Sequence, residues 1–277
     1  MIFNRRSRLA RKGRGAVKVL VSLNKRERFI FSVVILSIGL FVAEHLLGKS
    51  GIFMIFTMAF LTGLLLFLSL YYDLKENSSP QIFILPFFFS LSFGLFYFLV
   101  PARYLTRIFT TALYGVGLYS LFLSENIFIV SSIRTIALLQ SARTVAFVIT
   151  LISYFFLTNV LFSLHIQFVP FLIFLFLFSF PLIVHSIWTY TLEKNLFQNI
   201  YWPLILALLL LETASILWFW PSTPTVLAIF LTGVFYTIVG LYQVWLEKRL
   251  FKSVMWEYIW VSSIVLITLL LFTSWSG

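Results

Sequence analysis

The sequence predicts an all-α protein, a polytopic bundle of transmembrane helices with nine spans and an internal duplication. Of its 277 residues, 61% are hydrophobic and only 10% are charged, which leaves too little polar surface to cover a water-soluble globule. Apolar stretches long enough to cross about 30 Å of hydrocarbon recur along the chain and are separated by short connections. We therefore expect no soluble domain, and any chemistry must take place in or beside the bilayer.

A basic tail, residues 1–28, precedes the first span. It holds ten of the chain's 20 Lys and Arg residues but a single acidic residue, Glu27. This bias indicates a cytoplasmic segment that contacts anionic lipid headgroups or docks a partner. The residues expected to make that contact are Arg5, Arg6, Arg8, Arg11, Lys12 and Arg14. A nucleic-acid ligand is disfavoured, because no aromatic residue after Phe3 lies among these cations to stack on bases.

The predicted spans are bounded by turn residues and polar segments. Gly48–Gly51 forms a tight turn after the first span, and the polar stretch Asp73–Gln81 with Pro80 separates the second from the third. The nine spans are Phe29–Leu47, Ile52–Tyr72, Ile82–Val100, Ile108–Leu123, Thr144–Leu164, Pro170–Tyr190, Ile200–Trp220, Pro224–Leu246 and Val254–Trp275.

Short motifs recur in the same order in the two halves of the chain. Val116-Gly117-Leu118-Tyr119 returns as Val239-Gly240-Leu241-Tyr242, and Val130-Ser131-Ser132-Ile133 returns as Val261-Ser262-Ser263-Ile264. Arg28 before the first span is matched by Arg143 before a later one. We interpret the order as a duplication, with a first membrane repeat at 29–139 and a second at 143–277.

The segment Asn126–Arg143 decides the number of spans. Its counterpart in the second repeat is the last span, so if it also crosses, the chain has ten spans in two inverted repeats of five. That arrangement buries Arg134, at about 2.5 to 3.5 kcal/mol, and leaves only Lys75 of the cations beyond the tail in the cytoplasm.

Nine spans agree better with the rule that cytoplasmic loops are positive. Beyond the tail, the nine-span arrangement places seven cations inside, Lys75, Arg134, Arg143, Lys194, Lys248, Arg249 and Lys252, and three outside, Lys49, Arg103 and Arg107. We therefore favour nine spans with a cytoplasmic N-terminus, an external C-terminus, and an interfacial or re-entrant helix at 126–143.

Five polar residues form the candidate intramembrane site: Glu212, His185, Arg134, Asn159 and Gln243. A lone carboxylate near the centre of a span is expensive, so Glu212 should be protonated, paired or in a wet cavity; its role is a proton, cation or substrate site, or a neutral contact between helices. His185 follows Pro181 by one turn and is a relay or a packing histidine. Asn159 and Gln243 are typical of contacts between helices.

Missing motifs restrict the enzyme classes. The chain has no Cys, so it has no disulfide and no thiolate metal site. Asp73 is its only Asp, which leaves no paired Asp residues for a catalytic magnesium, and the HExxH, GxSxG and GxxxxGK motifs are absent. We expect no metal and no cofactor, and an enzyme is disfavoured though not excluded.

The stretch SENIFIVSSIRTIALLQSARTVAFVITLISYFFL resembles a segment of uncharacterised polytopic membrane proteins of uncultured small-genome bacteria. The resemblance covers about residues 100–165 and implies a bacterial inner membrane, but no mechanism.

Three functions follow as hypotheses. The first is a transporter for a small solute or lipid precursor that uses Glu212. The alternative is a membrane-embedded scaffold or subunit of a membrane complex, in which the basic tail and 126–143 dock a partner or anionic lipid. The third is a membrane enzyme that acts on lipid, with Glu212 and His185 as acid and base.

Overall fold

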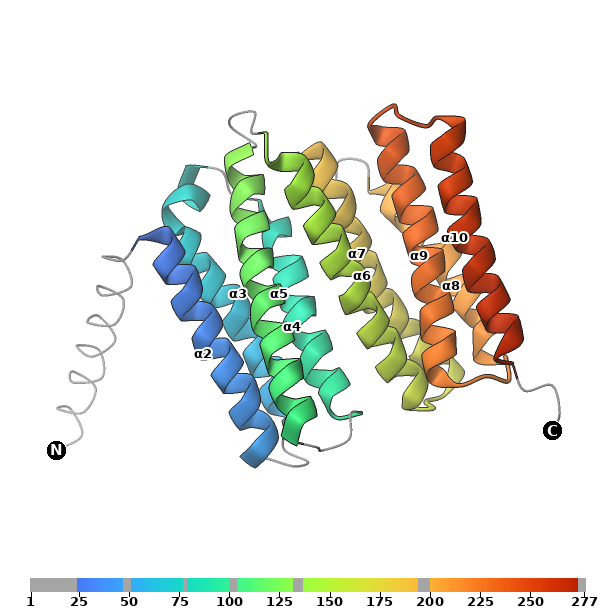
Figure 1. The fold of residues 1–277 in the computed structure, drawn as a ribbon, viewed down its shortest axis with the longest axis horizontal. Helices are drawn as coiled ribbons and strands as arrows, with labels where there is room; N and C mark the ends of the chain where they lie inside the picture. Colours follow the sequence, from blue (N-terminus) through green and yellow to red (C-terminus); the bar gives the residue numbers. More distant parts are fainter. Residues whose placement is uncertain are drawn as a thin grey trace.

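The computed structural model describes residues 24–46, 51–76, 79–99, 104–131, 137–193 and 200–273. Every regular element in these ranges is helical, and the helices stand side by side in one bundle (Figure 1). The elements are α2 (Lys25–Leu46), α3 (Gly51–Glu76), the 3-10 helix η2 (Pro80–Phe83), α4 (Ile84–Tyr97), α5 (Tyr104–Ser131), α6 (Leu139–Ser163), α7 (Phe168–Thr191), α8 (Tyr201–Trp218), α9 (Pro224–Leu246) and α10 (Lys252–Leu271).

Nine α-helices therefore make up the described chain, as the sequence predicts. Eight helical segments, from α3 to α10 with η2 and α4 counted as one, are long and apolar enough to cross a membrane. The exception is α2, which begins with the charged residues Lys25 to Arg28 and has Glu44 near its end. The prediction of an all-α, multi-pass membrane bundle is confirmed for these residues.

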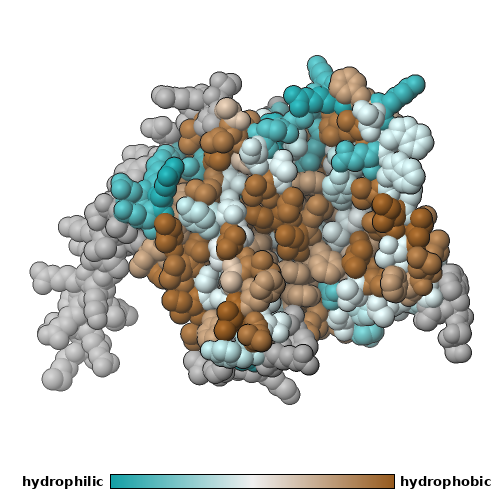
Figure 2. Space-filling view, in the orientation of Figure 1, coloured by the Kyte–Doolittle hydropathy of each residue, from teal (hydrophilic) through white to brown (hydrophobic). Residues whose placement is uncertain are grey.

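Successive helices run in opposite directions along the bundle (Figure 1). Consequently α2, α4, α6, α8 and α10 all begin at the same end, where an ion pair of 2.7 Å also joins Lys25 to Asp73 at the end of α3. We call this the basic end, because it carries the described cations Lys25, Arg26, Arg28, Arg143, Lys248, Arg249 and Lys252. In Figure 2 the hydrophilic residues gather along this edge above a broad apolar band.

The segment Asn126–Arg143 does not form a helix of its own, so that expectation is wrong. Its first part is the last stretch of α5, which runs to Ser131, and its last part opens α6 at Leu139. No Gly or Pro follows Gly117 to stop α5, and Phe128 and Ile129 are buried in the core, so the helix continues through the bundle. Arg134 lies outside the described residues.

The pattern of neighbouring helices is the same in both halves. In the first half α2 packs on α3 and α5, and α3 packs on α4; in the second half α6 packs on α7 and α9, and α7 packs on α8. The halves meet mainly where α4 and α5 contact α6, and α10 packs chiefly on α9. The duplication itself stays a prediction, and this recurrence is what it would produce.

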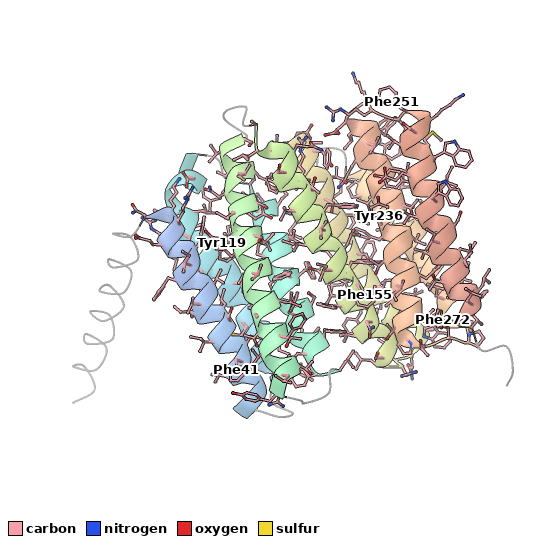
Figure 3. The ribbon with its side chains drawn as sticks, in the orientation of Figure 1. Phe41, Tyr119, Phe155, Tyr236, Phe251 and Phe272 are labelled. Carbon is pink, nitrogen blue, oxygen red and sulfur yellow. The ribbon has the colours of Figure 1, made fainter. Side chains whose placement is uncertain are left out.

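Side chains fill the spaces between the helices (Figure 3). Phe251 and Phe272, labelled there, mark the two ends of α10. Hydroxyl groups add directional contacts inside the first half, where Ser90 of α4 bonds to Thr62 of α3 at 2.7 Å and to Tyr114 of α5 at 2.8 Å. These bonds hold α5 in register against α3 and α4.

Candidate functional site

Glu125 and His185 form a buried pair between α5 and α7. The distance from His185 Nε2 to Glu125 Oε1 is 2.8 Å, and the side chains are 1% and 0% exposed, respectively. Sixty positions separate the two residues along the chain. The pair therefore links a helix of the first half to a helix of the second through an ionisable contact in the protein interior.

Local packing explains why both side chains point inward. Glu125 lies on the face of α5 that also buries Leu121, Phe122 and Phe128, and so it enters the core with them. On α7, His185 stands between Leu182 and Trp188, which are buried as well. The Trp188 ring lies 5.8 Å from the imidazole and 6.0 Å from the Phe128 ring, so aromatic groups cover the pair on one side.

Each member of the pair keeps unused hydrogen-bonding capacity. Within the described part of the chain, Glu125 Oε2 and His185 Nδ1 are buried and make no hydrogen bond, and the same holds for Asn126 Oδ1 and Ser186 Oγ, the next residue on each helix. Buried polar atoms of native proteins nearly always have a partner, often an ordered water or a ligand. In addition, a proton must lie between Nε2 and Oε1 in any state that keeps the contact. The site is thus equipped to hold a proton and one further polar group.

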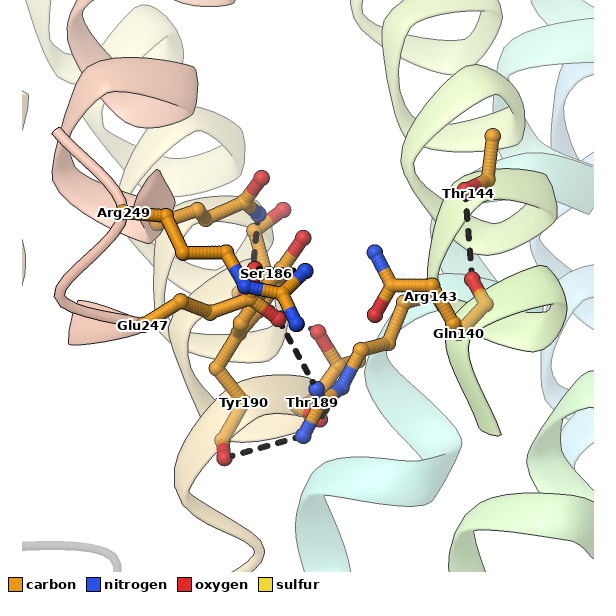
Figure 4. A network of polar contacts seen from close by, with 9 residues as sticks. Gln140, Arg143, Thr144, Ser186, Thr189, Tyr190, Glu247 and Arg249 are labelled. Carbon is orange, nitrogen blue, oxygen red and sulfur yellow. Dashed lines mark hydrogen bonds and ion pairs between the residues drawn. The ribbon is translucent and has the colours of Figure 1, made fainter. Parts of the chain in front are cut away.

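Arg143 connects three helices close to the basic end (Figure 4). From α6 its guanidinium donates to the Thr189 and Tyr190 carbonyl oxygens of α7, at 3.0 and 3.2 Å, and to Glu247 Oε1 after α9, at 3.1 Å. It also lies over the Tyr190 ring, 4.5 Å from the centroid. Because the last carbonyls of α7 lack helical donors, Arg143 caps that helix and pairs with the acid in one contact.

The structure separates the residues expected to form one site. Glu212 is exposed on the outside of α8, whereas His185 is buried and bonds to Glu125. Asn159 donates to Thr225 Oγ1 at 3.2 Å, and Gln243 donates to the Ser186 carbonyl at 3.2 Å, so both amides join helices. Arg134 is not described.

Sequence reasoning missed Glu125 because it placed the end of the span at Leu123. The signal was present in the absence of any helix-breaking residue between Gly117 and Ser131, which makes a longer helix with Glu125 inside it the simpler prediction. The Arg143–Glu247 pair had no comparable signal, since the two residues are 104 positions apart.

Neither a metal centre nor a large internal cavity accompanies the pair. Across the described ranges, no group of three or more His, Cys, Asp or Glu side chains could hold a metal ion. A pocket of about 260 Å³ opens at the end opposite the basic end, lined by His165, Phe171, Trp218 and Trp220 among others. Neither Glu125 nor His185 lines this pocket.

Comparison with known proteins gives one match. A family model described as "Protein of unknown function (DUF5656)" matches residues 29–272, which covers all the described helices except the first turn of α2. Neither the curated proteins nor the solved structures contain a match.

Proposed function

The chain belongs to the DUF5656 family, and we propose that it is a proton-linked membrane carrier for a small solute or lipid precursor, with Glu125 and His185 as its proton site. The observation that carries the proposal is the buried 2.8 Å contact between them, with one unused polar atom on each side chain. Ionisable residues inside a membrane bundle are rare because they are costly, and they commonly mark ion or substrate pathways.

The position of the pair supports a coupling role. Glu125 belongs to the first half and His185 to the second, so a movement of one half against the other changes their contact. Separating the two groups leaves two buried ionisable side chains without their partner, and the cost changes with the protons that they hold. Proton binding thereby favours one arrangement of the halves, which is what coupled transport requires.

The proposed location is the cytoplasmic membrane of a bacterium, with the basic end in the cytoplasm. Seven described cations lie at that end, whereas Arg107 lies at the start of α5, at the other end. This difference follows the positive-inside rule. The tail residues Arg5, Arg6, Arg8, Arg11, Lys12 and Arg14 would then face the anionic headgroups of the inner leaflet; they lie outside the described residues.

A scaffold or complex subunit is the second candidate. It is favoured by Glu212, whose exposed position on α8 is suited to a contact between membrane proteins and not to an internal pathway. The two candidates differ in which carboxyl group matters. A carrier depends on Glu125, whereas a subunit held through α8 depends on Glu212.

Currents from reconstituted protein test the carrier. The full chain in phosphatidylethanolamine–phosphatidylglycerol vesicles on a solid-supported membrane is exposed to amino acids, sugars, nucleosides and isoprenyl phosphates, with and without a pH gradient. We expect one class to give a current that depends on the gradient. Glu125→Gln should abolish this current, because the amide keeps the size and polarity of the side chain but exchanges no proton.

Glu212→Gln and Glu257→Gln are the matched controls, since each removes a carboxyl group that is exposed in the structure. Both should keep the current. A current that survives Glu125→Gln, a current lost only with Glu212→Gln, or no current from any class contradicts the proposal. Unchanged elution of each variant in detergent shows that the bundle is still folded.

A further inference from the structure

Glu212 interrupts an otherwise apolar outer face of α8. The residues that share this face one and two turns away are exposed and aliphatic: Ile205, Leu208, Leu209 and Ile216 are 46%, 48%, 42% and 64% exposed. Only 33% of the α8 span is buried in the bundle, against 61% for α6. The carboxyl group thus stands on a surface that the rest of this chain leaves uncovered.

Hydrocarbon is a poor partner for this surface because of that one group. In the described part of the chain, no hydrogen bond or ion pair reaches the Glu212 carboxyl. The adjacent hydroxyls are already used, since Thr213 and Ser215 donate to the carbonyls of Leu209 and Leu211, at 2.9 and 2.7 Å. A polar group that faces lipid without a partner costs free energy, which a contact with another helix can recover.

We infer that the outer face of α8 binds a second copy of this chain, with the two Glu212 carboxyl groups bonded to each other across a two-fold axis. A protonated carboxyl both donates and accepts, so two identical groups can satisfy one another. Two-fold contacts are self-complementary, and a face with one polar group among aliphatic residues meets that condition when the group lies on the axis.

The chain offers no better complement to Glu212. The described basic side chains lie at the ends of the helices, and those of Lys248, Arg249 and Lys252 project beyond the apolar band. None of them is at the depth of Glu212, which is the twelfth of the 18 residues of α8. Glu212 of a second copy is at that depth by symmetry.

Disulfide cross-linking tests the contact directly, because the chain has no Cys and any single Cys is unique. Leu208→Cys and Ile216→Cys place a thiol one turn before and one turn after Glu212 on the same face. Oxidation in native membranes should link each variant into a product of twice the 32.2 kDa chain mass. Ile264→Cys, at an equally exposed position on α10 (58%), is the matched control and should stay monomeric.

Substitutions at Glu212 in the Leu208→Cys background test the role of the carboxyl. Glu212→Gln should keep the cross-link, because an amide also donates and accepts, whereas Glu212→Leu should weaken association about tenfold. The inference is overturned if neither Cys position on α8 gives the double-mass product, if Ile264→Cys cross-links equally, or if Glu212→Leu associates as well as the parent. Since Glu125 is intact in all these variants, failure here leaves the carrier proposal untouched.

Discussion

Arg143 holds three helices together at the basic end with one side chain. Its three hydrogen bonds to α7 carbonyls and Glu247, together with the Tyr190 ring, use the planar fork of the guanidinium on several sides. The Arg143 side chain is 14% exposed, so these bonds are only weakly screened by solvent. By contrast, Arg249 meets the same acid at 3.7 Å with 67% of its side chain exposed.

The first prediction at this scale is therefore that Arg143→Lys destabilises the bundle. A lysine ammonium cannot reach both α7 carbonyls and Glu247 while covering the Tyr190 ring, so the free energy of unfolding should fall by about 1 to 3 kcal/mol. Thermal unfolding in detergent measures the loss. Arg249→Lys, the matched control, should change nothing measurable, and equal unfolding temperatures for the two variants would refute this account of Arg143.

The Glu125–His185 pair shows a different use of charge. It lies deep in the core and leaves two polar atoms unsatisfied, whereas the Arg143 guanidinium is used on several sides at once. A contact that serves stability alone would gain from partners for those atoms. This difference is why the proposed function rests on Glu125 and His185 and not on the Arg143 network.

At the scale of the helices, close packing depends on single glycines. Gly94 on α4 faces Ile55 on α3, and a Cβ added at Gly94 would come within 2.6 Å of the Ile55 side chain. Ile55 is β-branched and 98% buried, with 2% exposed, so it has little freedom to move aside. Gly63 on α3 differs, since a Cβ there would meet no atom within 4 Å.

Opposite effects are predicted for these two glycines. Gly94→Ala should force α3 and α4 apart and lower the free energy of unfolding by about 1 to 3 kcal/mol. Gly63→Ala should leave packing unchanged and raise stability by about 0.5 to 1 kcal/mol through helix propensity. Chemical unfolding of both variants in the same detergent compares them, and a stabilising Gly94→Ala would show that the α3–α4 contact is looser than described.

Across the whole molecule, nine alternating helices place the two described ends at opposite ends of the bundle (Figure 1). The recurrence of helix neighbours in the two halves agrees with repeats of four helices, each followed by a segment that differs: the end of α5 and the start of α6 in one case, α10 in the other. An even number of helices per repeat makes the repeats parallel and not inverted.

Reporter fusions after Gly277 test this topology. If α2 to α10 all cross and the basic end is cytoplasmic, an alkaline phosphatase fusion should be active and a fluorescent-protein fusion dark in a bacterial host. A second pair of fusions within the loop between α7 and α8 should give the reverse result. Fluorescence at Gly277 would mean an even number of crossings and would return the inverted ten-span arrangement to consideration.

Much of the fold could be predicted because its signals are local. Apolar length identifies each span, turn residues separate the spans, and the distribution of Lys and Arg distinguishes the two ends. These properties need no knowledge of which helix lies next to which. The predicted spans and the observed helices accordingly agree to within a few residues, except at α5, which runs on past Leu123 to Ser131.

The candidate site could be predicted only in part. His185 was identified because any ionisable residue inside a span is conspicuous, but Glu125 was assigned to a connection and Glu212 was assigned to the interior. In a membrane helix the lipid-facing and protein-facing sides are both apolar, so the sequence carries little signal of which side a residue occupies.

The sequence by itself thus determined that this is a helical membrane protein, how many helices it has and which end is basic, because length and composition act residue by residue along the chain. Only the tertiary structure decided that Glu125 meets His185, that Arg143 meets Glu247 and that Glu212 is left outside. Those outcomes depend on how helices distant in sequence rotate and pack against one another, which is a property of the assembled bundle.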